Sequence, residues 1–301
     1  MKSLIILSIF FHSILAFDYS LEPKKVNEAT HCFFGLSEVM DEHNNGNMSN
    51  SCFVNMGESY LVIDSGPTYS YAYQAHEKMK QIKDLPISFV INTHVHDDHW
   101  LGNSYYAELK IKIIGSKAFK DEPKVDETRM QRRISKEAYI KTTQEFPSLF
   151  VDQKKVLMFG KKEVHLISVN QKAHTKSDLL VYIPSEKMIF VGDLVFNDRI
   201  PSIRDGNLKG WIEALDEIAS LDVDFIIGGH GKIVDRTSID MTYNYIKTLQ
   251  KRVLTLLEDG EEIADVVNMV TMDEFKKVKF YDSMHRQNVE IAYRMLEWEV
   301  E

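Results

Sequence analysis

Three histidines and an aspartate stand within six residues, at His94, His96, Asp98 and His99. The apolar run at 87–91 just before them is typical of a short buried strand. Because residues at i and i+2 of an extended segment point the same way, His94 and His96 can bind one ion together. Asp98 and His99 fall beyond the expected bend and can face a second ion. Imidazole with carboxylate is the ligand chemistry of zinc, iron or manganese, whereas a His-rich surface loop would lack the preceding strand.

Three further candidates follow later in the chain. His174 lies in the segment A-H-T-K-S-D-L at 173–179, Asp193 lies near the end of the apolar run at 188–194, and His230 lies in the run at 225–231. The glycines beside His230 allow the backbone to approach a crowded centre. Each motif alone is weak evidence for a metal site. Their order along the chain, after the first four residues, strengthens it.

Alternating strand and helix signals predict an α/β fold. A strand at 60–63 ends in the turn D-S-G-P, and a helix is expected at 69–83 before the strand at 87–91. In sheets of this β-α-β kind, ligands lie at the C-terminal ends of strands, where Asp64 falls. The alternative for Asp64 is a simple turn residue. Further strands are expected at 111–115, 156–159 and 164–169, and helices at 238–257 and 261–301.

The motif H-x-H-x-D-H after a strand, followed by the other blocks in this order, resembles the metallo-β-lactamase fold hydrolases. The resemblance implies a four-layer αβ/βα sandwich with a C-terminal helical extension. It implies a first ion on His94, His96 and His174, and a second on Asp98, His99 and His230. Asp193 would bridge the two ions, Asp98 would also be catalytic, and Asp64 would support the site without binding metal. The chain departs from the usual A-H-T-x-G-D by carrying Ser177, which affects only the backbone of that loop.

The chemistry implied is hydrolysis by a hydroxide held between two zinc ions, with iron or manganese as alternatives. Ester, thioester, lactone, amide and phosphoester substrates all suit it. Within the family, the segment at 192–201, Trp211 and the segment at 228–231 look like the exported metallohydrolases associated with quinoprotein dehydrogenase and sulfur-oxidation gene sets. Four alternatives stay open: a true β-lactamase, whose best-known class has Cys where this chain has Asp193, a glyoxalase-type thioesterase, a mononuclear-iron persulfide dioxygenase, and a binding protein with a vestigial site.

Composition limits the partners. The chain has 301 residues, 44% of them hydrophobic and 27% charged, which is ordinary for a globular protein. A formal charge of −9 without a basic run disfavours nucleic acid, so a small-molecule substrate is expected. One domain over 17–301 is predicted, with no oligomeric state indicated.

The N-terminus resembles a secretory signal. Lys2 precedes an apolar run that ends near Ala16, and this run is too short to span a bilayer comfortably. A cleaved peptide at 1–16 predicts a periplasmic or secreted enzyme without stable membrane insertion.

Two cysteines, Cys32 and Cys52, flank an Asn- and Gly-rich turn at 41–50 that predicts a hairpin. In an oxidising compartment they can form a disulfide, and two unpaired buried thiols are the alternative.

The charged segment at 117–150 is typical of a solvated helix pair, and a mobile lid over the pocket is the functional alternative. With a loop carrying Phe196, Arg199 and Arg204, it is expected to form the pocket walls. The remaining histidines have no ligand-spaced neighbour and receive no metal role: His12, His31, His43, His76, His165 and His285.

Overall fold

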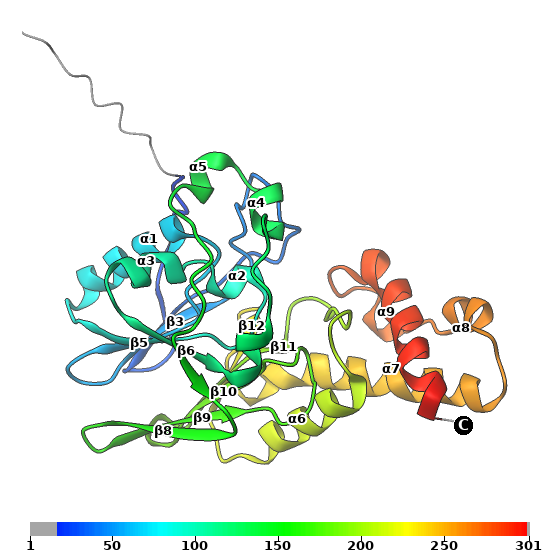
Figure 1. Ribbon diagram of the computed structural model, residues 1–301. Coiled ribbons are helices and arrows are strands. Elements are labelled where there is room, and N and C mark those ends of the chain that lie inside the picture. The colour runs from blue at the N-terminus through cyan, green and yellow to red at the C-terminus, as the bar shows by residue number, and fades with distance from the viewer. Residues whose placement is uncertain (1–16, 300–301) are drawn as a thin grey trace, which may run out of the picture.

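The computed structural model describes residues 17–299, so the predicted signal segment at 1–16 and residues 300–301 lie outside it. Two sheets lie face to face, with α1 and α3 on the outer side of one and α6 and α7 on the outer side of the other (Figure 1). The predicted αβ/βα sandwich is confirmed.

The first sheet has seven strands in the order β1-β2-β3-β4-β5-β6-β7. Their bounds are β1 Lys24–Lys25, β2 Thr30–Phe33, β3 Ser51–Asn55, β4 Tyr60–Ile63, β5 Ile87–Ile91, β6 Lys112–Ser116 and β7 Leu149–Val151. The helices inserted between these strands are α1 Tyr69–Ile82, α2 Asp97–Trp100, α3 Asn103–Glu108, α4 Arg129–Arg133 and α5 Lys136–Tyr139.

The second sheet has five strands in the order β12-β11-β10-β9-β8. Their bounds are β8 Lys154–Phe159, β9 Lys162–Ser168, β10 Leu179–Ile183, β11 Met188–Phe196 and β12 Phe225–His230. The helices are α6 Leu208–Ser220, α7 Asp240–Glu258, α8 Ile263–Met269 and α9 Tyr281–Leu296.

Side-chain alternation explains why the strands are buried on both faces. In β4, Val62 packs among the residues under α1, whereas Leu61 faces the layer between the sheets. In β11, Phe190 faces the layer between the sheets and Ile189 packs toward α6 and α7. Burying such a side chain contributes about 1.5–3 kcal/mol, so both faces stabilise the sandwich.

The site lies where parallel strands end. β4 pairs with β5 and β11 pairs with β12 in parallel, so the loops after these strands emerge at one edge. Thr68 caps α1 by accepting a hydrogen bond from the Tyr71 amide, which begins the helix just after the Asp64 turn. This arrangement brings the polar ends of distant strands together.

Cys32 and Cys52 form a disulfide, as the sequence allowed. They are directly opposite one another on the antiparallel strands β2 and β3, with Cα atoms 4.1 Å apart. The predicted hairpin is therefore present. Both cysteines lie in the apolar layer between the sheets.

The C-terminal region is helical, as predicted from its spacing. α7 packs against β11 of the second sheet, and α9 packs against α7, with Tyr245, Leu249 and Val289 in one apolar cluster. Within residues 17–299, no helix has both the length and the apolar character needed to cross a bilayer.

The segment at 117–150 is not the solvated helix pair that its charge predicts. It contains a 3-10 turn, the short helices α4 and α5, and β7, and Phe119, Met130 and Ala138 are buried in the core under α1 and α3. Charged residues cover its outer surface, so the amphipathic pattern is real, but its apolar side is anchored to the first sheet. Whether it moves as a lid stays a prediction.

Candidate metal centre

The first donor group combines three imidazoles and a carboxylate. Nδ1 of His96 lies 3.1 Å from Nε2 of His94 and 3.0 Å from Nε2 of His174. Oδ2 of Asp193 lies 3.6 Å from Nε2 of His94 and 3.4 Å from Nε2 of His174. β5 supplies His94 and His96 through the loop that follows it, and Asp193 lies on β11.

The second donor group shares Asp193. Its Oδ1 lies 3.1 Å from Nε2 of His99 and 3.3 Å from Nε2 of His230. Oδ2 of Asp98 lies 3.6 Å from each of these two nitrogens. Asp98 and His99 belong to α2, which makes the bend expected after His96, and His230 ends β12. One carboxylate thus presents an oxygen to each group.

The donor spacing suits metal ions. A tetrahedral ion with bonds of about 2.0–2.1 Å holds its ligand atoms roughly 3.3–3.4 Å apart, and the distances of 3.0 to 3.6 Å given above lie around this value. Nε2 of His99 and Oδ1 of Asp193 are buried without hydrogen-bond partners in the described structure. Buried donors and acceptors are normally satisfied, so cations between these atoms would explain their arrangement.

Hydrogen bonds from the opposite ring nitrogens fix which nitrogen faces each group. Nδ1 of His230 donates to the Met48 carbonyl at 2.8 Å, and Nε2 of His96 lies 3.2 Å from Oδ2 of Asp205. The ring nitrogen that faces the centre is therefore the one with a free lone pair, as a metal ligand requires.

Asp64 supports both groups from behind. Its Oδ2 accepts from Nδ1 of His99 at 2.8 Å and from the Thr93 hydroxyl at 2.8 Å, and that hydroxyl lies 3.1 Å from Nδ1 of His94. The Thr93 amide donates to Oδ1 at 2.8 Å. Asp64 adopts a positive φ of 55°, which Asp tolerates better than most residues. The turn residue thus orients two imidazoles, consistent with the supporting place that the resemblance implied for it.

Close approach around Asp193 requires glycine. A Cβ atom at Gly229 would collide with Oδ1 of Asp193. The glycine before His230 therefore leaves room for the carboxylate, which is the use expected from the sequence.

Burial and charge shift the titration of these groups. Burial lowers the pKa of His94 to about 4 and that of His174 to about 3, so both imidazoles are neutral near pH 7. Burial alone would also lower the pKa of His99, but the surrounding carboxylates, Asp193 first, raise it well above its usual value. Although burial opposes it, the neighbouring histidines hold the pKa of Asp193 well below its usual range. Neutral imidazoles and ionised carboxylates are the forms that bind metal, so His94, His174 and Asp193 are ready to bind, whereas His99 would release a proton on binding.

Arg129 of α4, in the 117–150 segment, reaches residues 94–100, which carry four of the candidate ligands and are called the metal loop below. Its guanidinium donates to Oδ1 of Asp97 at 2.6 and 3.1 Å and to Oδ1 of Asp98 at 2.9 Å. The Met130 amide donates to Oδ2 of Asp97 at 2.8 Å. Asp97 therefore attaches α4 to the centre.

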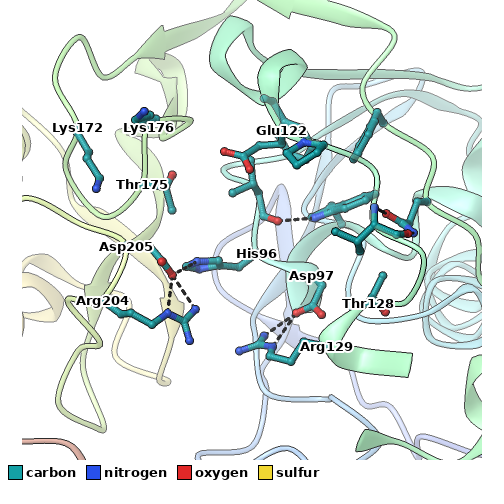
Figure 2. A pocket seen from close by; sticks show the side chains of 17 residues that line it. His96, Asp97, Glu122, Thr128, Arg129, Lys172, Thr175, Lys176, Arg204 and Asp205 are labelled. Atoms are coloured by element: carbon teal, nitrogen blue, oxygen red, sulfur yellow. Dashed lines mark hydrogen bonds and ion pairs between the residues drawn. The ribbon is translucent and has the colours of Figure 1, made fainter. Parts of the chain in front are cut away.

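A cavity of about 480 Å³ opens beside the first group, with His96 and Asp97 in its lining (Figure 2). Its apolar lining comes partly from the 117–150 segment, and Arg204 lines it as expected. Phe196 does not line it and stacks on the His230 ring at 4.9 Å. Arg199 lies over the Phe196 ring, away from the cavity lining. A volume of this size is typical of small-molecule sites.

All seven residues proposed as ligands converge: His94, His96, Asp98, His99, His174, Asp193 and His230. Among the other described histidines, none joins either group; His165, for example, lies beside Glu163 on β9. Ser177 does not adopt a positive φ, and its amide donates to the Thr175 hydroxyl. The loop shape that Ser177 placed in doubt is therefore formed without strain there.

Sequence reasoning missed Asp97, Arg129 and Asp205. Asp97 occupies a variable position of the H-x-H-x-D-H motif, where an exposed aspartate without a role in the site would be expected. Arg129 and Asp205 carry no local signal, since they come from distant segments.

The sequence comparisons identify a family. The description of the family model that matches residues 44–230 is Metallo-beta-lactamase superfamily. The Beta-lactamase-like protein 2 homolog of Caenorhabditis elegans is 23% identical over 236 residues, 75% of this chain and 71% of that protein. The Hydroxyacylglutathione hydrolase of Pelagibacter ubique is 23% identical over 222 residues, 70% of this chain and 77% of that protein.

A solved structure shares the fold. The metallo-beta-lactamase from Pontibacter korlensis matches with a TM-score of 0.60 at 17% identity, over 75% of this chain and 99% of that one. The similarity thus spans nearly the whole of that protein, whereas a quarter of this chain lies outside it.

Proposed function

The chain belongs to the metallo-β-lactamase superfamily, and from this membership we propose that it is an exported hydrolase that holds two zinc ions and cleaves thioesters or related acyl substrates. The observation that carries the proposal is the pair of donor groups that share Asp193. One carboxylate oriented toward two sets of imidazoles suits two ions side by side, and nitrogen and oxygen donors suit zinc. Iron and manganese accept the same donors.

Zinc in these groups would lower the pKa of a bound water toward neutrality and polarise the carbonyl of the substrate. The protein contributes geometry. Asp64 keeps the rings of His94 and His99 in place, and the Met48 carbonyl does the same for His230. Orientation of this kind is worth 10- to 100-fold in metal affinity or activity, roughly, in characterised metal sites. One oxygen of Asp98 accepts from Arg129 and the other faces the second group, so Arg129 holds Asp98 in a fixed orientation as a ligand.

Thioester hydrolysis is preferred among the acyl reactions because a relative of this chain is named Hydroxyacylglutathione hydrolase. The cavity beside His96 has room for an acyl group and its leaving group. Lactones, simple esters and amides remain in the same mechanistic class, because each has a carbonyl that the same nucleophile attacks.

Export is proposed from two features. The first residues of the chain have the pattern of a cleaved signal. The disulfide between Cys32 and Cys52 is stable in the periplasm or outside the cell, whereas the cytosol reduces such bonds.

Metal analysis with a hydrolysis screen tests the proposal. Protein purified from the exported fraction should hold two zinc ions per chain and hydrolyse thioesters faster than nitrocefin, lactones or phosphodiesters. His96→Ala should lose one ion and the hydrolysis, and His43→Ala, at an exposed residue outside both groups, should keep them.

Other outcomes point elsewhere. One iron with oxygen consumption would support a persulfide dioxygenase, and preferred turnover of nitrocefin would support a true β-lactamase. Full metal content and full rate in His96→Ala would contradict the site itself.

A further inference from the structure

The cavity has two chemically different walls. Val95, Trp100, Phe119, Pro123 and Phe146 give it an apolar side, built by the metal loop and the 117–150 segment. Lys172, Thr175 and Lys176 form part of another side, from the loop that carries His174 (Figure 2). A ligand in this space would contact apolar and cationic groups at the same time.

The cations of the cavity differ in their partners. Arg129 is paired with Asp97 and Asp98, and Arg204 donates to Asp205 at 2.6 and 3.0 Å. Lys172 and Lys176 have no carboxylate within 4.0 Å among residues 17–299. They stand two residues before and two residues after His174. The two unneutralised cations therefore flank a proposed ligand of the first ion.

We propose that Lys172 and Lys176 bind an anionic group of the substrate while its apolar part rests against Trp100 and Phe146. The inference rests on the proposed function, and it specifies the substrate class as acyl compounds with an apolar portion and a carboxylate or similar anion. The His174 loop then has two roles. Its histidine faces the metal centre, and its lysines favour substrates that carry a negative charge. The chain has a net charge of −9, and two lysines without carboxylate partners give this wall of the cavity a local positive charge that attracts an anion.

Glu122 is the acidic residue that opposes this assignment. It lines the cavity and forms no ion pair within the described part of the chain. Its carboxylate should repel an anion in the cavity, so it provides a second test with the opposite sign. Glu122→Gln should favour the anionic substrate if the anion lies in this cavity.

The experiment compares two aryl thioesters of the same size on the zinc-loaded protein. One carries a terminal carboxylate on its acyl chain, and the other carries the corresponding carboxamide. Lys172→Met and Lys176→Met should each raise KM for the carboxylate substrate about fivefold, the effect of losing one partly exposed ion pair, and leave KM for the carboxamide unchanged. Lys154→Met, on the exposed strand β8 outside the cavity lining, is the matched control.

A binding measurement makes the test independent of turnover. Thioether analogues of the two compounds, which cannot be hydrolysed, are titrated while the fluorescence of the tryptophans, which include Trp100 in the cavity, is followed. The carboxylate analogue should bind more tightly than the carboxamide, and salt should weaken only the former.

The outcomes separate the two proposals. Absence of hydrolysis with charge-selective binding would contradict the thioesterase function and leave the lysine subsite supported. Hydrolysis with equal KM values for both substrates, unchanged in the lysine variants and in Glu122→Gln, would overturn the subsite.

Discussion

Arg129 donates to Oδ1 of Asp98 at 2.9 Å, while Oδ2 of the same carboxylate lies 3.6 Å from the ring nitrogens of His99 and His230. The two oxygens of one side chain are thus divided between a guanidinium and the second donor group. Because Arg129 belongs to the segment that forms the apolar wall of the cavity, the wall and the metal centre are directly joined.

Arg129→Met should weaken the binding of the second zinc ion by about 10- to 100-fold, because Asp98 loses the partner that orients it. Competition with a chromophoric chelator measures the two affinities separately. Arg129→Lys should recover part of the loss, and Arg132→Met, on the exposed side of α4, should leave both affinities unchanged. Two wild-type affinities in Arg129→Met would show that Asp98 needs no such support.

Asp193→Cys should keep zinc but bind the pair less cooperatively, because a carboxylate spans both groups and a thiolate serves one. We expect loss of most native hydrolysis and only a small gain in nitrocefin turnover, since the cavity walls are unchanged. Zinc stoichiometry and rates on both substrates are measured beside wild type. Two tightly held ions with wild-type rates would mean that Asp193 does not bridge.

Loss of the disulfide should destabilise the protein by about 2–4 kcal/mol, because it closes a loop in the unfolded chain. The bond joins residues 20 positions apart and is buried between the sheets. Denaturant unfolding with and without reductant measures the difference, and the Cys32→Ala, Cys52→Ala double variant should be insensitive to reductant. Mass spectrometry that finds two thiol hydrogens in the exported protein would contradict the bond.

His76 should make the stability of the metal-free protein depend on pH. Burial first, and then Lys80, lowers its pKa to about 4, from 6.5 in the unfolded chain. Between these two pH values the unfolded state binds the extra proton. The free energy of unfolding is therefore highest above pH 6.5 and decreases as the pH falls toward 4. The loss from this residue is on the order of 2–3 kcal/mol.

Denaturant unfolding at several pH values tests this. His76→Phe should make the fall in stability between pH 6.5 and 4 less steep, although it also removes the hydrogen bond to the Tyr105 hydroxyl. His94 and His174, whose pKa values are also lowered, account for part of the fall that is left. The exposed residue His43, changed to Ala, is the control. An identical slope in wild type and His76→Phe would show that His76 is protonated in the folded state.

Local patterns in the sequence were enough to predict much of this protein. The strands β4 and β5 have the predicted bounds, and α1 ends one residue earlier than expected. Periodicity predicts such elements because side-chain direction follows directly from backbone geometry. The seven candidate ligands were also found from sequence, because most of them lie in short motifs that follow an apolar run and the family resemblance added His174.

Only the tertiary structure determined which partners surround these seven residues. His230 meets the Met48 carbonyl across 182 positions, His96 meets Asp205 across 109, and Asp98 meets Arg129 across 31. No local pattern encodes such contacts, because they depend on how two sheets pack and on where the connecting segments are anchored. The charge of the 117–150 segment predicted solvent exposure, yet the burial of Phe119 and Met130 attaches it to the core. The sequence by itself therefore determined the family and the candidate ligands, and packing decided which side chains orient them and which line the cavity.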